Sequence, residues 1–263
     1  MNGLTQKERY NMEDLLEIVA LLRDPENGCP WDKVQTHTSI RKNFIEETYE
    51  VADAIDLADA SLLCEELGDV LLQVALHTRM EEEQGAFTFG DVCTGICKKL
   101  IFRHPHVFGE VSVSGTGEVL SNWEELKRKE KGQATNTDAL EAVARSLPAL
   151  WRAEKVQKKA KKAGFDWPDV SGALDKLSEE LEELKTAVAE GTNVEEELGD
   201  LLFSAVNVSR FVKVDTEEAL NGATDKFIGR FRKVEEEAAR QGRALEGMSL
   251  AELDKLWEHA KET

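Results

Sequence analysis

One pattern of acidic residues occurs twice in this chain and constrains its fold more than any other sequence feature. In each copy a Glu-x-x-Glu motif is followed by Glu-Glu-Leu-Gly-Asp, which contains a Glu-x-x-Asp motif. The first quartet is Glu47, Glu50, Glu66 and Asp69, and the second quartet is Glu180, Glu183, Glu197 and Asp200. Equivalent residues lie about half a chain length apart. A repeat of this size predicts duplication, with two structural units of similar build.

Apolar residues around the second quartet recur with the period of an α-helix. They fall at alternating steps of four and three residues at Val170, Leu174, Leu177, Leu181, Leu184 and Val188. This spacing is typical of an amphipathic helix whose apolar stripe faces a core, and Glu180 and Glu183 border the stripe. A second helix follows from Val194, with Glu197 and Asp200 at the border of its own stripe.

The segment 191–193, Gly-Thr-Asn, predicts the turn between these two helices, with Asn193 as the N-cap of the second helix. An antiparallel helical hairpin would then bring both acidic pairs together at the edge of a core. The first half repeats this plan, with helices expected over 44–57 and 62–83. The sequence contains no useful alternating strand, so we expect an all-α fold of tandem helical-bundle modules. The polar stretch 131–137 predicts a linker between modules 1–132 and 138–263.

Each predicted hairpin concentrates carboxylates that repel one another. Residues three apart share a face of a helix, and like charges at that spacing destabilise it. A hard divalent cation would relieve the repulsion, and oxygen ligands suit Mg²⁺, with Mn²⁺ as a substitute. The alternative is a solvated charged surface, because 52 of the 263 residues are acidic. The ordered repetition of the whole quartet favours a metal site.

Cationic and aromatic residues follow each quartet in the same order. Lys226 and Arg230, one helical turn apart, precede Trp257 in the second half, and the first half has Lys99, Arg103 and Trp123. Carboxylates for a metal, cations for phosphates and an aromatic plane for a base together suit a nucleotide. The alternatives are a surface pair for the two cations and ordinary core packing for the tryptophan.

The overall charge restricts the expected partners and location. The formal net charge is −19, which disfavours nucleic acid or an anionic membrane as a partner because phosphates would be repelled. The four cysteines form no disulfide framework, and no secretory signal or long apolar stretch is present. These features predict a cytoplasmic protein with reduced thiols.

Several long segments resemble the MazG family of nucleoside triphosphate pyrophosphohydrolases over nearly the whole chain. The matching segments are LRDPENGCPWDKVQT (22–36), IEETYEV (45–51), EELGDVLLQV (65–74), RHPHVF (103–108), RSLPALWRAEKVQKKA (145–160), GFDW (164–167) and EEELGDLLFSAVN (195–207). The resemblance implies tandem all-α MazG modules, a homodimer, Mg²⁺ dependence and hydrolysis of nucleoside triphosphates to monophosphates and pyrophosphate. Such an enzyme would clear the nucleotide pool.

The resemblance also assigns roles to residues of the second module. It implies metal ligation by the second quartet and substrate contact by Lys176, Glu180, Glu196, Asp200, Lys226, Arg230 and Trp257. Lys176 lies one turn before Glu180, whereas Asn43 occupies the corresponding place before Glu47. This difference favours the second module as the working one, with the first quartet as a possible second metal site. The segment GCPWD (28–32) could line a pocket of the first module, or Trp31 could fill a core.

No serine, cysteine or histidine stands in a recognisable nucleophile arrangement, so direct attack by water is favoured. Glu196 is the expected catalytic base, while attack at the α-phosphorus follows from the resemblance alone. Stacking on a tryptophan discriminates weakly among bases, which predicts broad base tolerance. A di-iron protein is disfavoured because no histidine has the required Glu-x-x-His spacing from the quartets. A helical sensor or adaptor that binds Mg-nucleotide without turnover remains the alternative.

Overall fold

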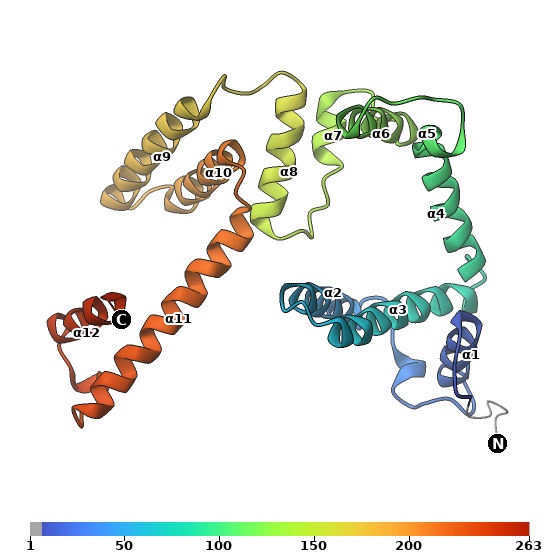
Figure 1. Ribbon diagram of the computed structural model, residues 1–263, viewed down its shortest axis with the longest axis horizontal. Coiled ribbons are helices and arrows are strands. Elements are labelled where there is room, and N and C mark those ends of the chain that lie inside the picture. Colours follow the sequence, from blue (N-terminus) through green and yellow to red (C-terminus); the bar gives the residue numbers. More distant parts are fainter. Residues whose placement is uncertain (1–6, 263) are drawn as a thin grey trace. The chain divides into compact units, whose positions relative to one another are not determined.

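The computed structural model describes residues 7–262, without the side chains of Leu120, Glu124 and Glu262 (Figure 1). Within that range all regular structure is helical and no strand occurs, which confirms the expected all-α class. None of the described helices is both long enough and apolar enough to cross a lipid bilayer. The chain divides after Lys127 into two compact units, the N-terminal unit and the C-terminal unit.

The N-terminal unit is built around two long helices that carry the first quartet. Its elements are α1 (Met12–Leu22), η1 (Asp32–Val34), α2 (Arg41–Asp56), α3 (Ala60–Glu83), α4 (Phe89–Arg103), α5 (Pro105–Phe108) and most of α6 (Thr116–Glu130). α2 and α3 pack along one another as a hairpin, and α1 packs against α3. The expected pair of helices over 44–57 and 62–83 is therefore present.

The C-terminal unit contains the second quartet on a similar hairpin. Its elements are α7 (Asn136–Glu141), α8 (Ala149–Lys162), α9 (Val170–Glu190), α10 (Val194–Val212), α11 (Thr216–Arg240), η2 (Leu245–Gly247) and α12 (Leu250–Glu262). α9 pairs with α10, α8 packs against α10, and α12 folds back on α11. α6 ends at Glu130 and α7 begins at Asn136 behind a Thr135 capping box. The linker 131–137 stays a prediction.

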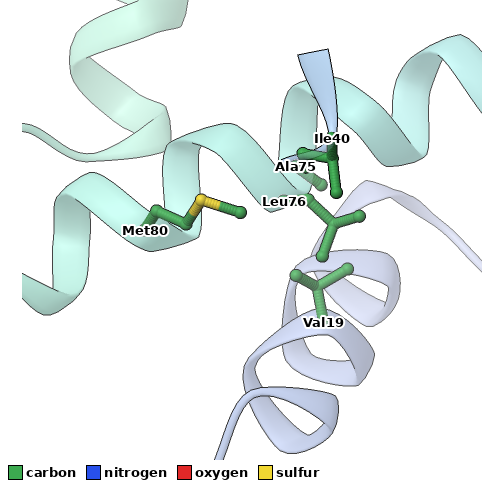
Figure 2. Close-up of a cluster of buried hydrophobic side chains, with 5 residues drawn as sticks. All are labelled: Val19, Ile40, Ala75, Leu76 and Met80. Atoms are coloured by element: carbon green, nitrogen blue, oxygen red, sulfur yellow. The ribbon is translucent and has the colours of Figure 1, made fainter. Parts of the chain in front are cut away.

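A small apolar cluster holds α1 against α3. Val19 of α1 and Leu76 of α3 face one another, with Ile40, Ala75 and Met80 beside them (Figure 2). All five side chains are buried. Removing an aliphatic side chain of this size from water contributes about 1.5–3 kcal/mol, so the cluster stabilises the crossing of α1 and α3.

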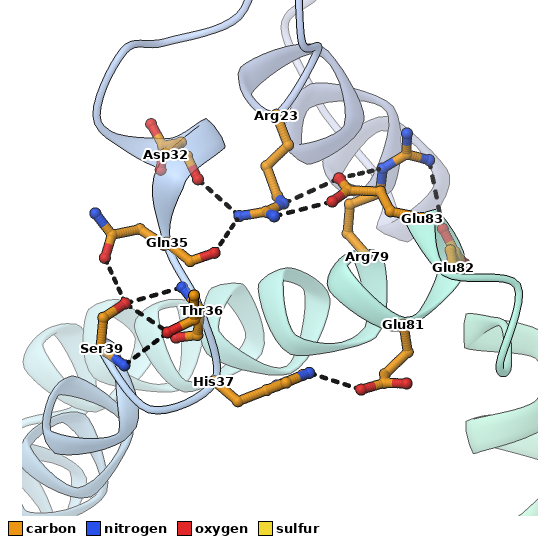
Figure 3. Close-up of polar contacts among 10 residues, drawn as sticks. All are labelled: Arg23, Asp32, Gln35, Thr36, His37, Ser39, Arg79, Glu81, Glu82 and Glu83. Carbon is orange, nitrogen blue, oxygen red and sulfur yellow. Dashed lines mark hydrogen bonds and ion pairs between the residues drawn. The ribbon is translucent and has the colours of Figure 1, made fainter.

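Arg23, at the C-terminal end of α1, connects three segments of the N-terminal unit (Figure 3). Its guanidinium donates two hydrogen bonds to the Glu83 carboxylate, at 3.0 and 2.9 Å. The same group donates to the backbone oxygens of Asp32, at 2.7 Å, and Gln35, at 3.2 Å. The Arg23 side chain is only 6% exposed, and this pairing lowers the pKa of Glu83. One buried cation thus fixes the loop before α2 onto the end of α3.

The loop after α1 makes a close backbone turn that requires glycine. A Cβ at position 28 would lie 2.4 Å from the Asp24 oxygen and 2.5 Å from the Leu22 oxygen, which no side chain tolerates. Trp31 at the end of this turn is 57% exposed. The hypothesis that Trp31 fills a core is therefore wrong for the described unit.

The turn between α9 and α10 uses left-handed backbone conformations. Gly191 has φ +70° and Asn193 has φ +52°. Asn193 occupies the N-cap position of α10, but its side chain makes no capping hydrogen bond, so the expected cap is wrong. The reason is conformational, because an N-cap side chain accepts from the first turn when its backbone is extended. Three glutamates, 195–197, occupy the first turn instead, where they complement the helix dipole.

The face of α9 that is buried differs from the face the apolar stripe predicts. Ala173, Glu180 and Ala187 are buried at seven-residue spacing, whereas Leu174 and Leu181 are exposed. Two small alanines let α9 approach its neighbour closely along this line. Glu180, expected at the border of the stripe, consequently lies in the middle of the buried face.

Candidate metal and nucleotide site

Three carboxylates of the second quartet converge where α9 and α10 pair. Oxygen atoms of Glu180, Glu183 and Glu197 all lie within 4.8 Å of one another. The fourth predicted ligand, Asp200, is exposed and stands outside this group. Three carboxylates from two helices form an oxygen-only cluster of the kind that hard divalent cations prefer.

Charged side chains surround this cluster and shift the pKa values of its members. Glu180 is only 5% exposed, and its carboxylate lies 2.7 Å from the Lys176 amine, which also contacts Glu179 at 2.8 Å. Hydrogen bonds to Glu179 and then Glu180 raise the pKa of Lys176. Desolvation, followed by the charge of Glu180, raises the pKa of Glu183. Added positive charge would therefore stabilise the ionised form of this site.

An open cavity of 440 Å³ extends from the cluster toward the α9–α10 turn. Glu183 and Glu197 line its inner end, and Thr186 and Glu190 continue the wall along α9. The last two residues were absent from the sequence-based set, although their helical spacing after Glu183 is the signal that identifies them. An acidic lining repels a free triphosphate, so an anionic ligand here requires a bound cation.

The predicted base, Glu196, lies in the first turn of α10 and is exposed. It is adjacent in sequence to the cluster member Glu197. Between residues 7 and 262 its side chain has no hydrogen bond or ion pair, and the residue is exposed to solvent.

The remaining predicted substrate residues lie on α11 and α12, apart from the carboxylate cluster. Lys226 is exposed and Arg230 half-buried, and neither forms an ion pair within the described range. Trp257 packs against the buried cluster of α11 and α12, and its ring centroid is 5.0 Å from that of Phe227. Within one chain, the structure thus joins Lys176 to the quartet and leaves these three residues without contacts to it.

The first quartet also converges, but with a different membership. Oxygen atoms of Glu47, Glu66 and Asp69 lie within 4.8 Å of one another. The charge of Glu50 adds to the repulsion on Glu47 and Glu66. Desolvation is the largest cause that raises the pKa of Glu47 and of Glu66. Across the described residues, no lysine or arginine forms an ion pair with this quartet.

The residues equivalent to Arg230 and Trp257 meet in the N-terminal unit. The Arg103 guanidinium lies over the Trp123 ring, 5.3 Å from its centroid. The Lys127 amine approaches the same ring at 4.7 Å. Arg103 is buried, so this cation stabilises the local packing through its contact with the ring.

The chain belongs to the MazG family. The model of the MazG nucleotide pyrophosphohydrolase domain matches residues 35–108 and 170–235, which include both quartets. The chain is 44% identical over 254 residues to the nucleoside triphosphate pyrophosphohydrolase of Escherichia coli K12, covering 95% of this chain and 97% of that protein. It is 47% identical over 249 residues to the nucleoside triphosphate pyrophosphohydrolase/pyrophosphatase MazG of Thermotoga maritima, with 95% of each chain covered. A match of 50% identity to the Bacillus subtilis protein YabN covers 94% of this chain and half of that protein.

Proposed function

We propose that this protein hydrolyses nucleoside triphosphates to nucleoside monophosphates and pyrophosphate. The observation that carries the proposal is the convergence of Glu180, Glu183 and Glu197 from two helices beside an acidic cavity. Membership of the MazG family and the names of the relatives from E. coli and T. maritima support the same reaction. The C-terminal unit is the proposed working site.

The second quartet is the proposed site of Mg²⁺, with Mn²⁺ as a substitute. Glu180, Glu183 and Glu197 fit a divalent ion because their oxygens are close together, and because desolvation and the charge of Glu180 raise the pKa of Glu183. Asp200, which lies outside this group of three, would complete the proposed set from the next turn of α10. When bound, the ion would polarise the triphosphate and acidify a water molecule. The first quartet is proposed as a second, weaker ion site.

Cationic residues are proposed to hold the triphosphate. Lys176 is nearest to the cluster, so it would stabilise charge that develops on the phosphates. Lys226 and Arg230 have no ion-pair partner within residues 7–262, which leaves both side chains available for phosphate oxygens. Trp257 would support the base, and stacking of this kind is the basis of the broad base tolerance we propose.

Water is the proposed nucleophile, with Glu196 as the general base. Glu196 would accept a proton from water while the water oxygen attacks the α-phosphorus. The bond from the α-phosphorus to the bridging oxygen then breaks, and pyrophosphate departs with the bonding electrons. The nucleoside monophosphate retains the oxygen from water. Clearance of nucleotides from the cytoplasm is the role proposed for this reaction.

A homodimer is proposed because long helices expose apolar side chains at regular spacing. Leu174, Leu181 and Val188 are exposed at seven-residue intervals along α9, and Leu198 and Leu202 are exposed on α10. A second copy of the hairpin would cover such a stripe. Sedimentation should show a dimer for the wild type and a monomer for Leu181→Glu. Lys185→Glu, on the same helix, should leave the dimer intact.

Turnover in water enriched in ¹⁸O tests the reaction directly. The full-length protein with Mg²⁺ should convert ATP, CTP, GTP and UTP to monophosphate and pyrophosphate, and EDTA should stop it. The label should appear in the monophosphate, because attack at the α-phosphorus transfers the water oxygen there. Label in pyrophosphate would place the attack at the β-phosphorus. Binding of Mg-nucleotide without turnover would instead identify a sensor or adaptor and overturn the proposal.

A further inference from the structure

Two of the four cysteines lie one helical turn apart on α4 of the N-terminal unit. Cys93 and Cys97 are four positions apart in this helix, so their side chains share a face and their Cβ atoms are about 5–6 Å apart. Both are free thiols, of which Cys97 is exposed to solvent and Cys93 is half-buried. Free cysteine is among the most buried residue types, so packing alone does not account for such a pair on one helix face.

The surface of α4 around the two thiols is open to solvent. Ile96 is 48% exposed, and Ile101, one turn beyond Cys97, is 52% exposed. Within residues 7–262 neither thiol forms a hydrogen bond. A small molecule in solution can therefore reach Cys97 Sγ, and this thiol has no hydrogen bond to give up when it reacts.

The other two cysteines of the chain do not form such a pair. Cys29 lies in the loop after α1, and Cys64 lies in α3. Neither has a second cysteine within a helical turn in the sequence. Cys64 is exposed as Cys97 is, so it provides an internal control for the reactivity of a single exposed thiol.

A disulfide between Cys93 and Cys97 requires one turn of α4 to tighten. The Cβ atoms of a disulfide are about 3.5–4.5 Å apart, so the two side chains must approach one another by about 1 Å. Gly95 lies midway between them, and glycine lets a helical backbone depart from its regular dihedral angles at low cost. The bond would still be strained, and strained, exposed disulfides are easily reduced. Such a bond suits a reversible modification.

We propose that Cys93 and Cys97 are a site of reversible oxidation by glutathione disulfide. The thiolate of the exposed Cys97 attacks one sulfur of glutathione disulfide, whose S–S bond breaks and releases one glutathione thiolate. The Cys93 thiolate then attacks Cys97 Sγ and displaces the second glutathione. Two cysteine thiols are thereby oxidised, one glutathione disulfide is reduced to two thiols, and the two protons pass from the cysteines to glutathione.

This oxidation is independent of the carboxylate quartets and goes beyond the proposed hydrolysis. It needs no metal and no nucleotide, and both thiols belong to the N-terminal unit. Disulfides that form in a reducing compartment are usually transient and serve in redox sensing. The easily reduced bond expected on α4 belongs to that kind, so it agrees with a chain whose thiols are otherwise reduced.

Mass spectrometry of the full-length protein tests the proposal after incubation with glutathione disulfide and alkylation of the remaining thiols. A mildly alkaline buffer favours the attacking thiolate. The peptide that contains Cys93 and Cys97 should carry no alkyl group and should be two hydrogens lighter than the reduced peptide. Cys64 should be alkylated or carry glutathione. Dithiothreitol should restore both thiols of the pair.

Three variants separate the two steps of the exchange. Cys93→Ser should accumulate a mixed disulfide between Cys97 and glutathione, because no second thiol displaces it. Gly95→Ala keeps both thiols and introduces no clash, since no atom lies within 4 Å of the added Cβ. It should lower the equilibrium constant for disulfide closure about fivefold, because alanine holds the helix in its regular form. Cys64→Ser should oxidise as the wild type does.

Circular dichroism and melting curves confirm that each variant is folded. The proposal is overturned if Cys93 and Cys97 both remain alkylated at millimolar glutathione disulfide, or if electrophoresis without reductant shows that they pair between chains. Equal oxidation of folded Gly95→Ala and the wild type would also overturn it, since closure would then not depend on the turn between the thiols. Glu183→Gln should lose hydrolysis yet oxidise normally, so failure of the hydrolase proposal and failure of the thiol site are distinguishable.

Discussion

The two acidic quartets share their residue types but differ in the charges around them. In the C-terminal unit, Lys176 neutralises Glu180 at 2.7 Å. In the N-terminal unit, Asn43 takes the place of that lysine, and the charge of Glu50 repels Glu47 and Glu66. We propose that this difference, and not the repeated carboxylate motif, decides which unit is the working one. The positive charge beside the motif distinguishes the two copies.

The position of each quartet on its helix sharpens this contrast. Glu197 lies in the first turn of α10, where the positive end of the helix dipole favours an anion. Glu66 lies beyond the first turn of α3, which contains no acidic residue. The C-terminal quartet thus has two sources of positive potential, the dipole and Lys176, that its counterpart lacks.

The largest difference we expect is in the response to removing one ligand. Glu183→Ala should reduce turnover at least about a hundredfold, because a catalytic metal contributes several kcal/mol. Glu50→Ala, at the equivalent position of the N-terminal unit, should retain most of the activity. Release of pyrophosphate at saturating Mg²⁺ measures both. Retention of more than about a tenth of the wild-type rate by Glu183→Ala would contradict the assignment of the working site.

Among the effects on stability, we expect the largest from removing the buried contacts of Arg23. Arg23→Met breaks a buried ion pair with Glu83 and leaves the backbone oxygens of Asp32 and Gln35 without their hydrogen-bond donor. This loss should lower the free energy of unfolding by about 3 kcal/mol. Arg79→Met removes a more exposed pair to the same glutamate and should cost about 1 kcal/mol or less. Denaturant titration monitored by circular dichroism compares them. Equal losses of unfolding free energy in the two variants would show that the burial of Arg23 does not increase its contribution to stability.

An intermediate effect is expected from exchanging the residue that differs between the units. Lys176→Asn gives the C-terminal unit the residue found at position 43, and it should lower kcat about ten- to a hundredfold. Lys185→Asn removes another lysine of α9, paired with Glu182 at 2.7 Å, and should leave kcat within about twofold. Similar kcat values for the two variants would contradict the proposed contact between Lys176 and the phosphates.

Much of the fold could be predicted because helical periodicity is a local property. The expected helix over 44–57 corresponds to α2 (Arg41–Asp56), and the expected hairpins carry both quartets. The buried face of α9 could not be predicted from the apolar stripe. Ala173 and Ala187 decide that face by allowing close approach, and this depends on neighbouring helices that the spacing does not identify.

The carboxylates of the candidate site were more predictable than their surroundings. Six of the eight carboxylates in the Glu-x-x-Glu and Glu-x-x-Asp motifs converge in two groups of three, because residues three apart share a helix face, whereas Glu50 and Asp200 lie outside these groups. The contacts of Gln157 and Arg210 join residues separated by more than forty positions. No local pattern encodes such pairings, so they became visible only in the structure.

The smallest effect is expected in the dependence of stability on pH. Desolvation, followed by repulsion from the neighbouring carboxylates, raises the pKa of Glu47 and of Glu66, so in EDTA the native state binds more protons than the unfolded state above pH 4.5. Their contribution to stability is present below that pH and is lost as pH rises through the raised values.

Glu50→Gln removes part of this repulsion from the N-terminal unit. Its Tm should match the wild type near pH 4 and exceed it slightly at pH 7. Saturating Mg²⁺ should reduce the difference at pH 7, because a bound cation relieves the same repulsion. The prediction is contradicted if the Tm of the wild type rises above that of Glu50→Gln as pH increases from 4 to 7.

The buried contacts of Arg23 also affect the order in which the N-terminal unit folds. The Arg23 partner Glu83 lies 60 positions away, so the N-terminal unit cannot close until most of α3 has left the ribosome. The α2–α3 hairpin joins helices separated by a short turn, and local contacts of this kind form fastest. Loop-closure entropy therefore places the docking of α1 after the formation of that hairpin, and the apolar cluster around Val19 stays open to chaperones for that interval.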